Sequence, residues 1–425
     1  MKLSLKKIWQ DNFSRGTLIL TVVSIGGAAL NYLVHPILTR RLSVTEYGDF
    51  QALLSFVTIL VFVGAVIQTT LTKEIALLKD TNEGAISILS KRVTRTLWLV
   101  GVVVFIVVAF SAPSLTHFFN INSQFGIILV SAILMYLAPL LVNRAILTGL
   151  QRFSDLSLST FLEPAFRLLL IVLLVIVWPL RLTGAAIALG GTSLLAFIIS
   201  YFQIKKLNLA RSTNNPSFFK PVVSYGLLVL WFTVLTQFFF NFDILFVKAN
   251  FDAQSAGLYG ALLTIGRIIF FIGSAIPLAM FPVIANLKKD TSLKKFKVFV
   301  QAMGFSLILT VPIASFIAFF PELTIRIIVG AKYLSMASYL PLMTVVFFLE
   351  TILIVVGQYF LALSRRLSLV YLSFGVLAEI IFLIYFHHTI PEIIFTLIFI
   401  FGILDILLFI LFIKDYQRAS LALRN

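Results

Sequence analysis

Long apolar stretches, separated by short polar segments, run the whole length of the chain. Each holds about 20 largely apolar residues, which is the length that an α-helix needs to cross a bilayer. We predict twelve membrane-spanning helices, over residues 16–37, 50–71, 96–115, 125–147, 160–180, 183–203, 222–241, 255–285, 298–320, 338–360, 367–386 and 392–413. The eighth stretch contains Pro277 and Pro282, so we expect it to kink or to end early.

The two halves of the chain echo one another. Residues 257–264 match residues 48–55 at an offset of 209, with four of the eight positions identical: Gly48/Gly257, Ala52/Ala261, Leu53/Leu262 and Leu54/Leu263. Each copy opens the second apolar stretch of its half. The polar break from Lys205 to Lys220 then divides the chain into two predicted lobes, residues 1–210 and 211–425.

An even number of helices in each lobe brings the chain back to the side on which it entered, so the repeat is a parallel one. The predicted fold is therefore an all-α integral membrane protein, with two parallel six-helix lobes around a central cavity. Duplicated membrane halves usually place a translocation pathway between them.

The composition agrees with a membrane protein, since 60% of the residues are hydrophobic and only 12% are charged. The net charge of +16 is unevenly distributed. If both termini are cytoplasmic, 24 Lys and Arg residues fall on the cytoplasmic side, 6 on the opposite side and 3 at membrane depth. This bias is the positive-inside rule. The basic charge is thus a topology signal, and we expect no nucleic-acid partner.

Signatures of enzymes and cofactor sites are missing. The chain has no cysteine, no phosphate-binding Gly-x-x-x-x-Gly-Lys loop, no Asp-x-Asp pair and no nucleophile–base motif. His387 and His388 lie in a short outer loop, where we expect no carboxylate at ligand spacing. The sequence therefore predicts no catalytic residue, no metal and no cofactor, and favours a transporter.

Three arginines lie at membrane depth: Arg144, Arg167 and Arg267. A charge at the bilayer centre costs about 2.5–3.5 kcal/mol, so such residues face protein or an aqueous cavity. Arg167 follows Glu163 by four residues and could pair with it, and Arg144 could reach the cytoplasmic surface. Arg267 has no acid within four residues on its own helix. It needs an acid on another helix or an anion-binding cavity, and we favour the cavity.

Further charges extend this picture. Arg40 and Arg41 close the first helix on the outer side, either as headgroup anchors or as the mouth of a cationic cavity. Several arginines in one cavity favour a polyanion such as a diphosphate, because guanidinium groups bind phosphate bidentately. The acids in or near the spans are candidates for coupling to an H⁺ or Na⁺ gradient: Asp243, Glu350, Glu379 and Asp405.

Three short motifs resemble one family. The segment LTRRLSVTEYG (38–48) is similar to the signature after the first helix of polysaccharide flippases, which carry O-antigen and capsule repeat units. AGLYG (256–260) looks like its second-half counterpart, and GLQRF (149–153) resembles the Gly-x-x-Arg-Phe loop after the fourth helix. The family belongs to the multidrug/oligosaccharidyl-lipid/polysaccharide exporter superfamily.

The resemblance implies a function and some site residues. Members of the family form two six-helix lobes in a V and move undecaprenyl-diphosphate-linked sugar units from the cytoplasmic to the outer leaflet. Arg40 matches the signature arginine. Arg267 lies in the eighth helix, where related lipid-linked-precursor flippases carry a cavity arginine. Multidrug members usually carry an acid in the first helix, and residues 16–37 contain none.

We therefore predict a non-enzymatic flippase of a bacterial cell membrane that works by alternating access. Its partners would be a polyprenyl-diphosphate-linked oligosaccharide, the bilayer, a polysaccharide polymerase and glycosyltransferases. The alternatives are a cation-coupled multidrug exporter, a membrane-embedded polysaccharide polymerase or ligase, and a scaffold without transport. An enzyme of that kind needs a sizeable outer loop with catalytic residues, and the longest predicted outer loop (321–337) carries only Glu322, Arg326 and Lys332 as charges.

The predicted topology can be tested by cysteine labelling, because the chain has no native cysteine. We expect both termini and the loop from Lys205 to Lys220 to be cytoplasmic. An impermeant thiol reagent added to intact cells should then label an Asn214→Cys variant weakly and a Ser335→Cys variant strongly. The reverse pattern would overturn the topology.

Overall fold

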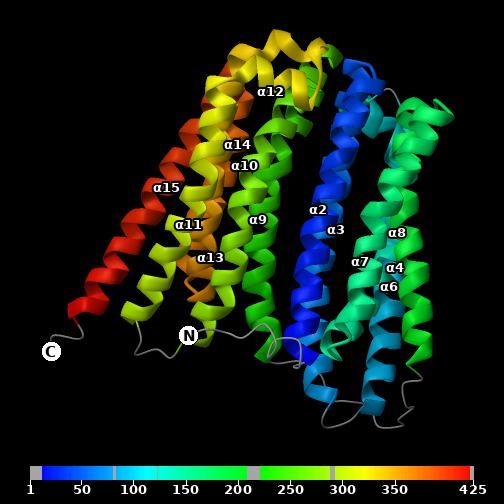
Figure 1. Cartoon of the computed structure of the whole chain (residues 1–425), viewed down its shortest axis with the longest axis vertical. Coiled ribbons are helices and arrows are strands. Elements are labelled where there is room, and N and C mark those ends of the chain that lie inside the picture. The colour runs from blue at the N-terminus through cyan, green and yellow to red at the C-terminus, as the bar shows by residue number, and fades with distance from the viewer. Residues whose placement is uncertain (1–11, 80–82, 122, 208–220, 288–291, 422–425) are drawn as a thin grey trace. The chain divides into compact units, whose positions relative to one another are not determined.

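The computed structural model describes residues 12–79, 83–121, 123–207, 221–287 and 292–421. Within these residues every regular element is a helix (Figure 1). The chain divides into two compact units, Met1–Gly226 and Leu227–Asn425. The predicted lobe boundary, between residues 210 and 211, lies outside the described residues.

The first unit is built from long helices that run side by side, joined by short turns (Figure 1). Its elements are α2 (Asn12–Arg41), α3 (Val44–Lys79), α4 (Glu83–Phe118), α5 (Gln124–Ser131), α6 (Ile133–Gly149), α7 (Phe153–Ile171), the π-helical turn η1 (Val172–Val177) and α8 (Arg181–Lys206). Helix α7 packs against α2 and α8, and α6 packs against α3, α4 and α8. Helices α6 and α8 are therefore central to this unit, and α2 packs on its α7 side.

The second unit repeats this construction. Its elements are α9 (Pro221–Asn250), which begins before the unit boundary, α10 (Ala253–Asn286), α11 (Ser292–Phe319), α12 (Pro321–Ile328), the 3-10 helix η2 (Ala331–Tyr339), α13 (Leu340–Ala362), α14 (Arg366–Tyr385) and α15 (Ile390–Leu421). Helix α13 lies at the centre and packs against α10, α11 and α15.

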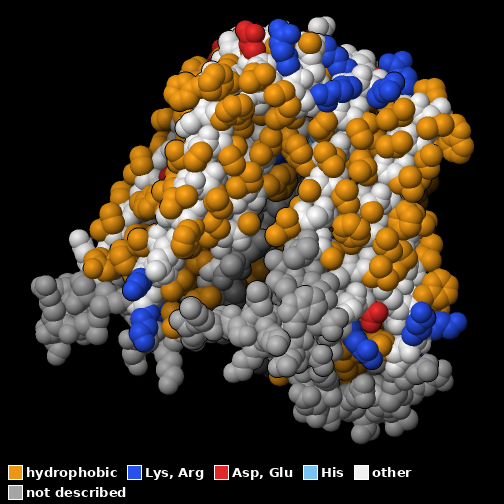
Figure 2. Space-filling model, viewed as in Figure 1, with side chains coloured by type: hydrophobic (Ala, Val, Ile, Leu, Met, Phe, Trp, Pro, Cys, Tyr) orange, Lys and Arg blue, Asp and Glu red, His pale blue; other side chains and the backbone are white. Residues whose placement is uncertain are grey.

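The surface of the helices is that of a multi-pass membrane protein. Ten helices in the described residues are long and apolar enough to cross a bilayer. Figure 2 shows hydrophobic side chains along the length of the helices on the visible face, with Lys and Arg near the helix ends. The first two predicted stretches lie in α2 and α3, where several side chains fall outside the described residues. The count of twelve spans therefore stays a prediction.

The fourth predicted stretch is present as one candidate span, Gln124–Gly149, in which the helix is interrupted for one residue at Ala132, between α5 and α6. One predicted element was wrong. The predicted outer loop 321–337 forms α12 and most of η2, and Pro321 provides the preset backbone angle that favours a helix start. Helix α10 continues past Pro277 to Asn286, so an early end is excluded and the expected kink stays a prediction.

The internal echo marks the start of one helix in each unit. In α3, Ser43 and Glu46 form a capping box, with the Ser43 amide donating to Glu46 Oε2 (2.8 Å) and the Glu46 amide donating to Ser43 Oγ (3.2 Å). In α10, Asp252 Oδ1 accepts from the amides of Gln254 and Ser255, both at 3.0 Å. The hydrogen bonds from Ser255 and Gln254 lower the pKa of the Asp252 carboxyl. Each copy of the repeat therefore follows an N-cap.

Small residues on α8 allow close packing against the preceding helices. A Cβ atom added at Gly190 would lie 2.9 Å from the Leu129 carbonyl oxygen of α5, whereas one added at the next residue, Gly191, would meet nothing within 4 Å. Backbone atoms cannot yield as a flexible side chain can. Gly190 is therefore required by packing, and Gly191 is not.

This contrast predicts opposite effects for two adjacent substitutions. Gly190→Ala should destabilise the protein, because overpacking costs about 1–3 kcal/mol. Gly191→Ala should leave stability unchanged or raise it, since alanine gains about 1 kcal/mol over glycine inside a helix. Thermal unfolding in detergent measures both variants. Equal melting temperatures for the two would contradict the close contact between α8 and α5.

Candidate functional site

Two guanidinium groups share one carboxylate inside the first unit. Arg144 on α6 donates through Nη2 to Glu163 Oε2 on α7 at 2.7 Å. Arg167, one turn along α7, donates through Nη2 to Glu163 Oε1 at 3.4 Å. The side chains of all three residues are 15–18% exposed. Two positive charges around one negative charge leave a net charge of +1.

Polar side chains from two other helices complete this group. Ser193 on α8 donates to Glu163 Oε1 at 2.8 Å. Arg167 also donates through Nη1 to Asn31 Oδ1 on α2 (2.8 Å) and through Nε to Thr192 Oγ1 on α8 (3.4 Å). We call these six residues the arginine cluster: Asn31, Arg144, Glu163, Arg167, Thr192 and Ser193. It ties α2, α6, α7 and α8 together.

The arginine cluster brings together two of the predicted site residues, Arg144 and Arg167. The pairing of Arg167 with Glu163 at four-residue spacing is present. Arg144 does not extend alone toward the surface, because Glu163 holds it. The sequence identified these three residues but did not predict that Arg144 pairs with Glu163. The two residues are 19 positions apart and lie on different helices, joined by a turn.

Arg40 and Arg41 lie at the end of α2 and are exposed. Arg40 donates through Nη1 to the Pro36 carbonyl oxygen of its own helix at 2.9 Å, so its guanidinium folds back along α2. Arg40 is nine residues beyond Asn31, which is about 13 Å along an α-helix. The two arginines are therefore not part of the arginine cluster.

Two residues of the first signature motif, Glu46 and Tyr47, make contacts between helices. Glu46, besides capping α3, forms an ion pair with Arg181 at the start of α8 (2.8 Å). Tyr47 is fully buried, and its hydroxyl contacts His35 Nδ1 on α2 and accepts from Gln51 Nε2, both at 3.0 Å. These contacts join α2, α3 and α8. The Glu-Tyr pair of the motif thus has a structural role in this chain.

The second unit contains a buried group of opposite charge. Asp243 on α9, Glu350 on α13 and Glu379 on α14 are 4%, 3% and 0% exposed and lie within electrostatic range of one another. Arg267 on α10 is 6% exposed and within electrostatic range of Asp243 and Glu350. We call these residues, with Tyr259, the acidic cluster. Three of the four predicted coupling acids and Arg267 therefore lie in one place.

Only part of the acidic cluster is hydrogen-bonded. Tyr259 Oη donates to Asp243 Oδ2 at 2.8 Å. Arg267 donates through Nη2 to the Phe240 carbonyl oxygen (2.7 Å), and its guanidinium carbon lies 4.3 Å from the Phe240 ring centroid. Within the described residues, both oxygens of Glu379 and Oε1 of Glu350 are buried without a hydrogen-bond partner. Burying such groups is costly. Arg267 is within electrostatic range of Asp243 and Glu350, and Glu379 is within range of those two acids, so the cluster carries excess negative charge unless it takes up protons or cations.

Asp405 on α15 lies outside the acidic cluster. The residue is 6% exposed, and its two carboxyl oxygens are buried without a hydrogen-bond partner within the described residues. Its role in ion coupling stays a prediction.

The surroundings of His387 and His388 differ from the prediction. We expected no carboxylate near His387 and His388, but Glu392 lies one turn along and its Oε2 accepts from the His388 amide at 2.9 Å and contacts His388 Nδ1 at 3.3 Å. The contact lies at the N-terminus of α15, where the Glu392 amide donates to Thr389 Oγ1 at 3.4 Å and the Glu392 side chain reaches back to the residue before the cap. In the part of the chain that the structure describes, no three His, Cys, Asp or Glu side chains are placed to hold a metal ion.

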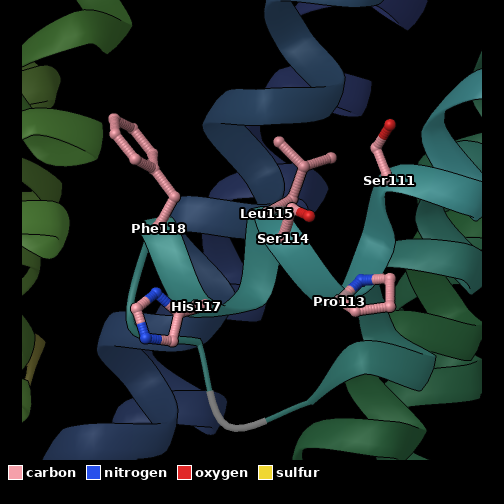
Figure 3. A pocket seen from close by; sticks show the side chains of 6 residues that line it. All are labelled: Ser111, Pro113, Ser114, Leu115, His117 and Phe118. Carbon is pink, nitrogen blue, oxygen red and sulfur yellow. The ribbon is translucent and has the colours of Figure 1, made fainter.

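An open groove lies at the end of α4. Figure 3 shows the six residues that line it, all from this helix: Ser111, Pro113, Ser114, Leu115, His117 and Phe118. None of the predicted site residues lines it, and His117 is its one titratable side chain. The groove adds nothing to the two charged clusters.

Solved structures share the fold at low sequence identity. An inward-facing multidrug resistance MATE family transporter of the MOP superfamily matches with a TM-score of 0.74 and 13% identity, over 95% of this chain and 99% of its own. The lipid II flippase MurJ, in an inward closed conformation, matches with a TM-score of 0.70 and 14% identity, over 95% and 90%. A MOP superfamily transporter from Pyrococcus furiosus, described as having a binding pocket of reverse polarity, matches with a TM-score of 0.63 and 15% identity, over 98% and 97%. The fold is thus that of MOP superfamily transporters.

The family follows from the sequence. The model of the polysaccharide biosynthesis protein family matches residues 13–288, more than half of the chain, and the chain belongs to this family. No curated protein matches it. The predicted resemblance to the polysaccharide branch of the superfamily is therefore confirmed.

The acidic cluster generates a prediction for Arg267. Arg267→Ala removes the positive charge from among three buried acids, and breaking a buried pair costs about 3–5 kcal/mol. We expect less folded protein by size-exclusion chromatography, with partial recovery when Glu350→Gln is added. Arg326→Ala, at an exposed arginine of α12, is the matched control and should accumulate normally. Normal amounts of folded Arg267→Ala would instead favour the predicted anion-binding cavity.

Proposed function

We propose that the protein is a flippase that moves undecaprenyl-diphosphate-linked oligosaccharide units from the cytoplasmic to the outer leaflet by alternating access. Family membership supports a role in polysaccharide biosynthesis, and the fold supports transport. The proposed substrate class is inferred from the arginine cluster. Two arginines inside candidate membrane spans, with one carboxylate between them, provide a positively charged and partly exposed site.

A diphosphate fits this chemistry better than the alternatives. Guanidinium groups bind phosphate oxygens bidentately, and the desolvated interior of a membrane protein strengthens such bonds. The sugar would remain in water, and the polyprenyl chain would remain in lipid. Arg40 and Arg41 are proposed as an outer contact for the same headgroup. For Arg267, the neighbouring acids favour a role in the acidic cluster over a direct contact with substrate.

The finer features of the protein belong to the same proposal. They are twelve spanning helices in two six-helix lobes, cytoplasmic termini, a place in the bacterial inner membrane and no enzymatic activity. A polysaccharide polymerase and glycosyltransferases would act after and before the transport step. The positive-inside charge bias and the family support these features.

The acidic cluster is the proposed site of ion coupling. Asp243, Glu350 and Glu379 would exchange H⁺ or Na⁺ with one side of the membrane at a time. Their burial and the incomplete hydrogen bonding of Glu350 and Glu379 support this role, because the free energy of such groups depends strongly on bound cations. Asp405 is a second candidate on burial alone.

A cation-coupled multidrug exporter is the second candidate function. The fold is shared with MATE transporters, and the acidic cluster would attract cationic drugs. The arginine cluster argues against it, because it repels cations in the first unit. A polymerase or ligase has less support, since the outer segment 321–337 is a short helix and a 3-10 helix with few polar side chains.

Deletion of the gene tests the proposed function. Without a flippase, the lipid-linked sugar intermediate should accumulate in the cytoplasmic leaflet and surface polysaccharide should fall. Extraction and mass spectrometry of polyprenyl-linked sugars measure the first, and surface staining measures the second. A plasmid copy should restore both. Normal surface polysaccharide, in a strain shown to have no second flippase, would contradict the proposal, whereas altered resistance to cationic drugs would favour the exporter.

A further inference from the structure

Glu163 accepts hydrogen bonds from both arginines of the arginine cluster, but neither arginine donates to it through two N–H groups. Arg144 reaches the carboxylate through Nη2, while its Nε is buried without a hydrogen-bond partner in the described residues. Arg167 spreads its guanidinium over three acceptors on three helices, and its contact with Glu163 is long, at 3.4 Å. No bidentate pair is formed. The donors of the cluster therefore exceed what one carboxylate accepts.

An oxyanion with more oxygens would fit these donors better. A phosphate group presents three or four oxygens and can accept from two guanidinium groups at once. The Ser193 hydroxyl donates to Glu163 Oε1 at 2.8 Å and so holds the carboxylate against the two arginines. Partial exposure of all three charged side chains, at 15–18%, leaves the group open to a competing anion.

We propose that Glu163 is an internal counter-anion. It occupies the anion-binding site of the first unit when no substrate is bound, and a phosphate group of the substrate displaces it. This inference rests on the proposed function and adds a residue that sets affinity and release. Glu163 offsets one of the two positive charges of Arg144 and Arg167 between transport events, when two bare guanidinium groups in an apolar interior would be costly. It then competes with the bound phosphate and speeds its release.

Competition by Glu163 has a consequence that a purely structural salt bridge lacks. Removing the carboxylate without changing its shape should raise the affinity for phosphate ligands and slow their release. Tight binding of the ground state does not speed a transport cycle. The same change should therefore lower turnover, so that affinity and rate move in opposite directions.

Binding of inorganic pyrophosphate and of geranyl diphosphate to the purified full-length protein tests the inference. The protein is held in phosphatidylcholine nanodiscs, so that no anionic lipid competes. Glu163→Gln should bind both probes about tenfold more tightly than the wild type, which corresponds to one charge-assisted hydrogen bond. The matched control is Asp415→Asn, which removes the acid from the exposed ion pair with Arg365 and should leave affinity unchanged.

A milder variant keeps the test decisive if Glu163→Gln fails to fold. Ser193→Ala removes one hydrogen bond from Glu163 and changes no charge. It should loosen the carboxylate and raise probe affinity about twofold. Loss of folding does not raise affinity, so an increase in either variant supports displacement of Glu163. Wild-type or weaker binding in every folded variant overturns it.

The proposed substrate site is tested separately by Arg144→Gln and Arg167→Gln. If these variants lose probe binding while Glu163→Gln and Ser193→Ala gain none, the site stands and the counter-anion role is overturned. If neither arginine variant changes probe binding, the proposed diphosphate site itself is wrong. An anionic lipid as the natural occupant is detected by replacing part of the phosphatidylcholine with phosphatidylglycerol. Competition from that lipid equal to geranyl diphosphate would overturn the assignment to a diphosphate.

Discussion

Each unit must neutralise its own charges at membrane depth, and this constraint organises both candidate sites. An ion in an apolar interior is stable only with a partner of opposite charge or with water. The first unit meets the requirement with one carboxylate, Glu163, between two arginines. The second unit has one guanidinium, Arg267, near three acids, and it meets the requirement when protons or cations are bound. The two units thus carry charged clusters of opposite sign, one suited to anions and the other to cations.

The predicted repeat coincides with structural contacts near the start of the second helix of each unit. Both copies of the repeat follow a capped helix start, although a Ser-Glu box serves α3 and an Asp serves α10. In both, a fully buried tyrosine early in the second helix bonds a polar residue of the first: Tyr47 to His35, and Tyr259 to Asp243. At the offset of 209 the two tyrosines are not equivalent, because Tyr47 aligns with Ala256 and Tyr259 with Phe50. Only in the second unit is the polar partner one of a group of acids.

The sequence predicted helices well and helix interruptions poorly. The length of an apolar run is set by the bilayer, so the run itself reveals the helix. The break at Ala132 is invisible because the residues on both sides are equally apolar. Residues at fixed helical spacing, such as Glu163 and Arg167, were paired from the sequence. The proximity of Asp243, Glu350 and Glu379 was not predicted from the sequence. It depends on which face each of three helices turns toward the others, and Asp243 and Glu379 are more than a hundred residues apart along the chain.

Opposite charge in the two units also constrains how transport could be driven. If an anionic substrate binds the first unit and an ion binds the second, the two ligands do not share protein contacts. Ion binding then changes substrate affinity only to the extent that each ligand prefers the same conformation of the whole protein. Glu163 matters in this arrangement because an internal anion keeps the empty first unit near neutrality. The empty protein can then change conformation without carrying two uncompensated guanidinium groups through an apolar environment, which is the step that a transporter must complete to begin a new cycle.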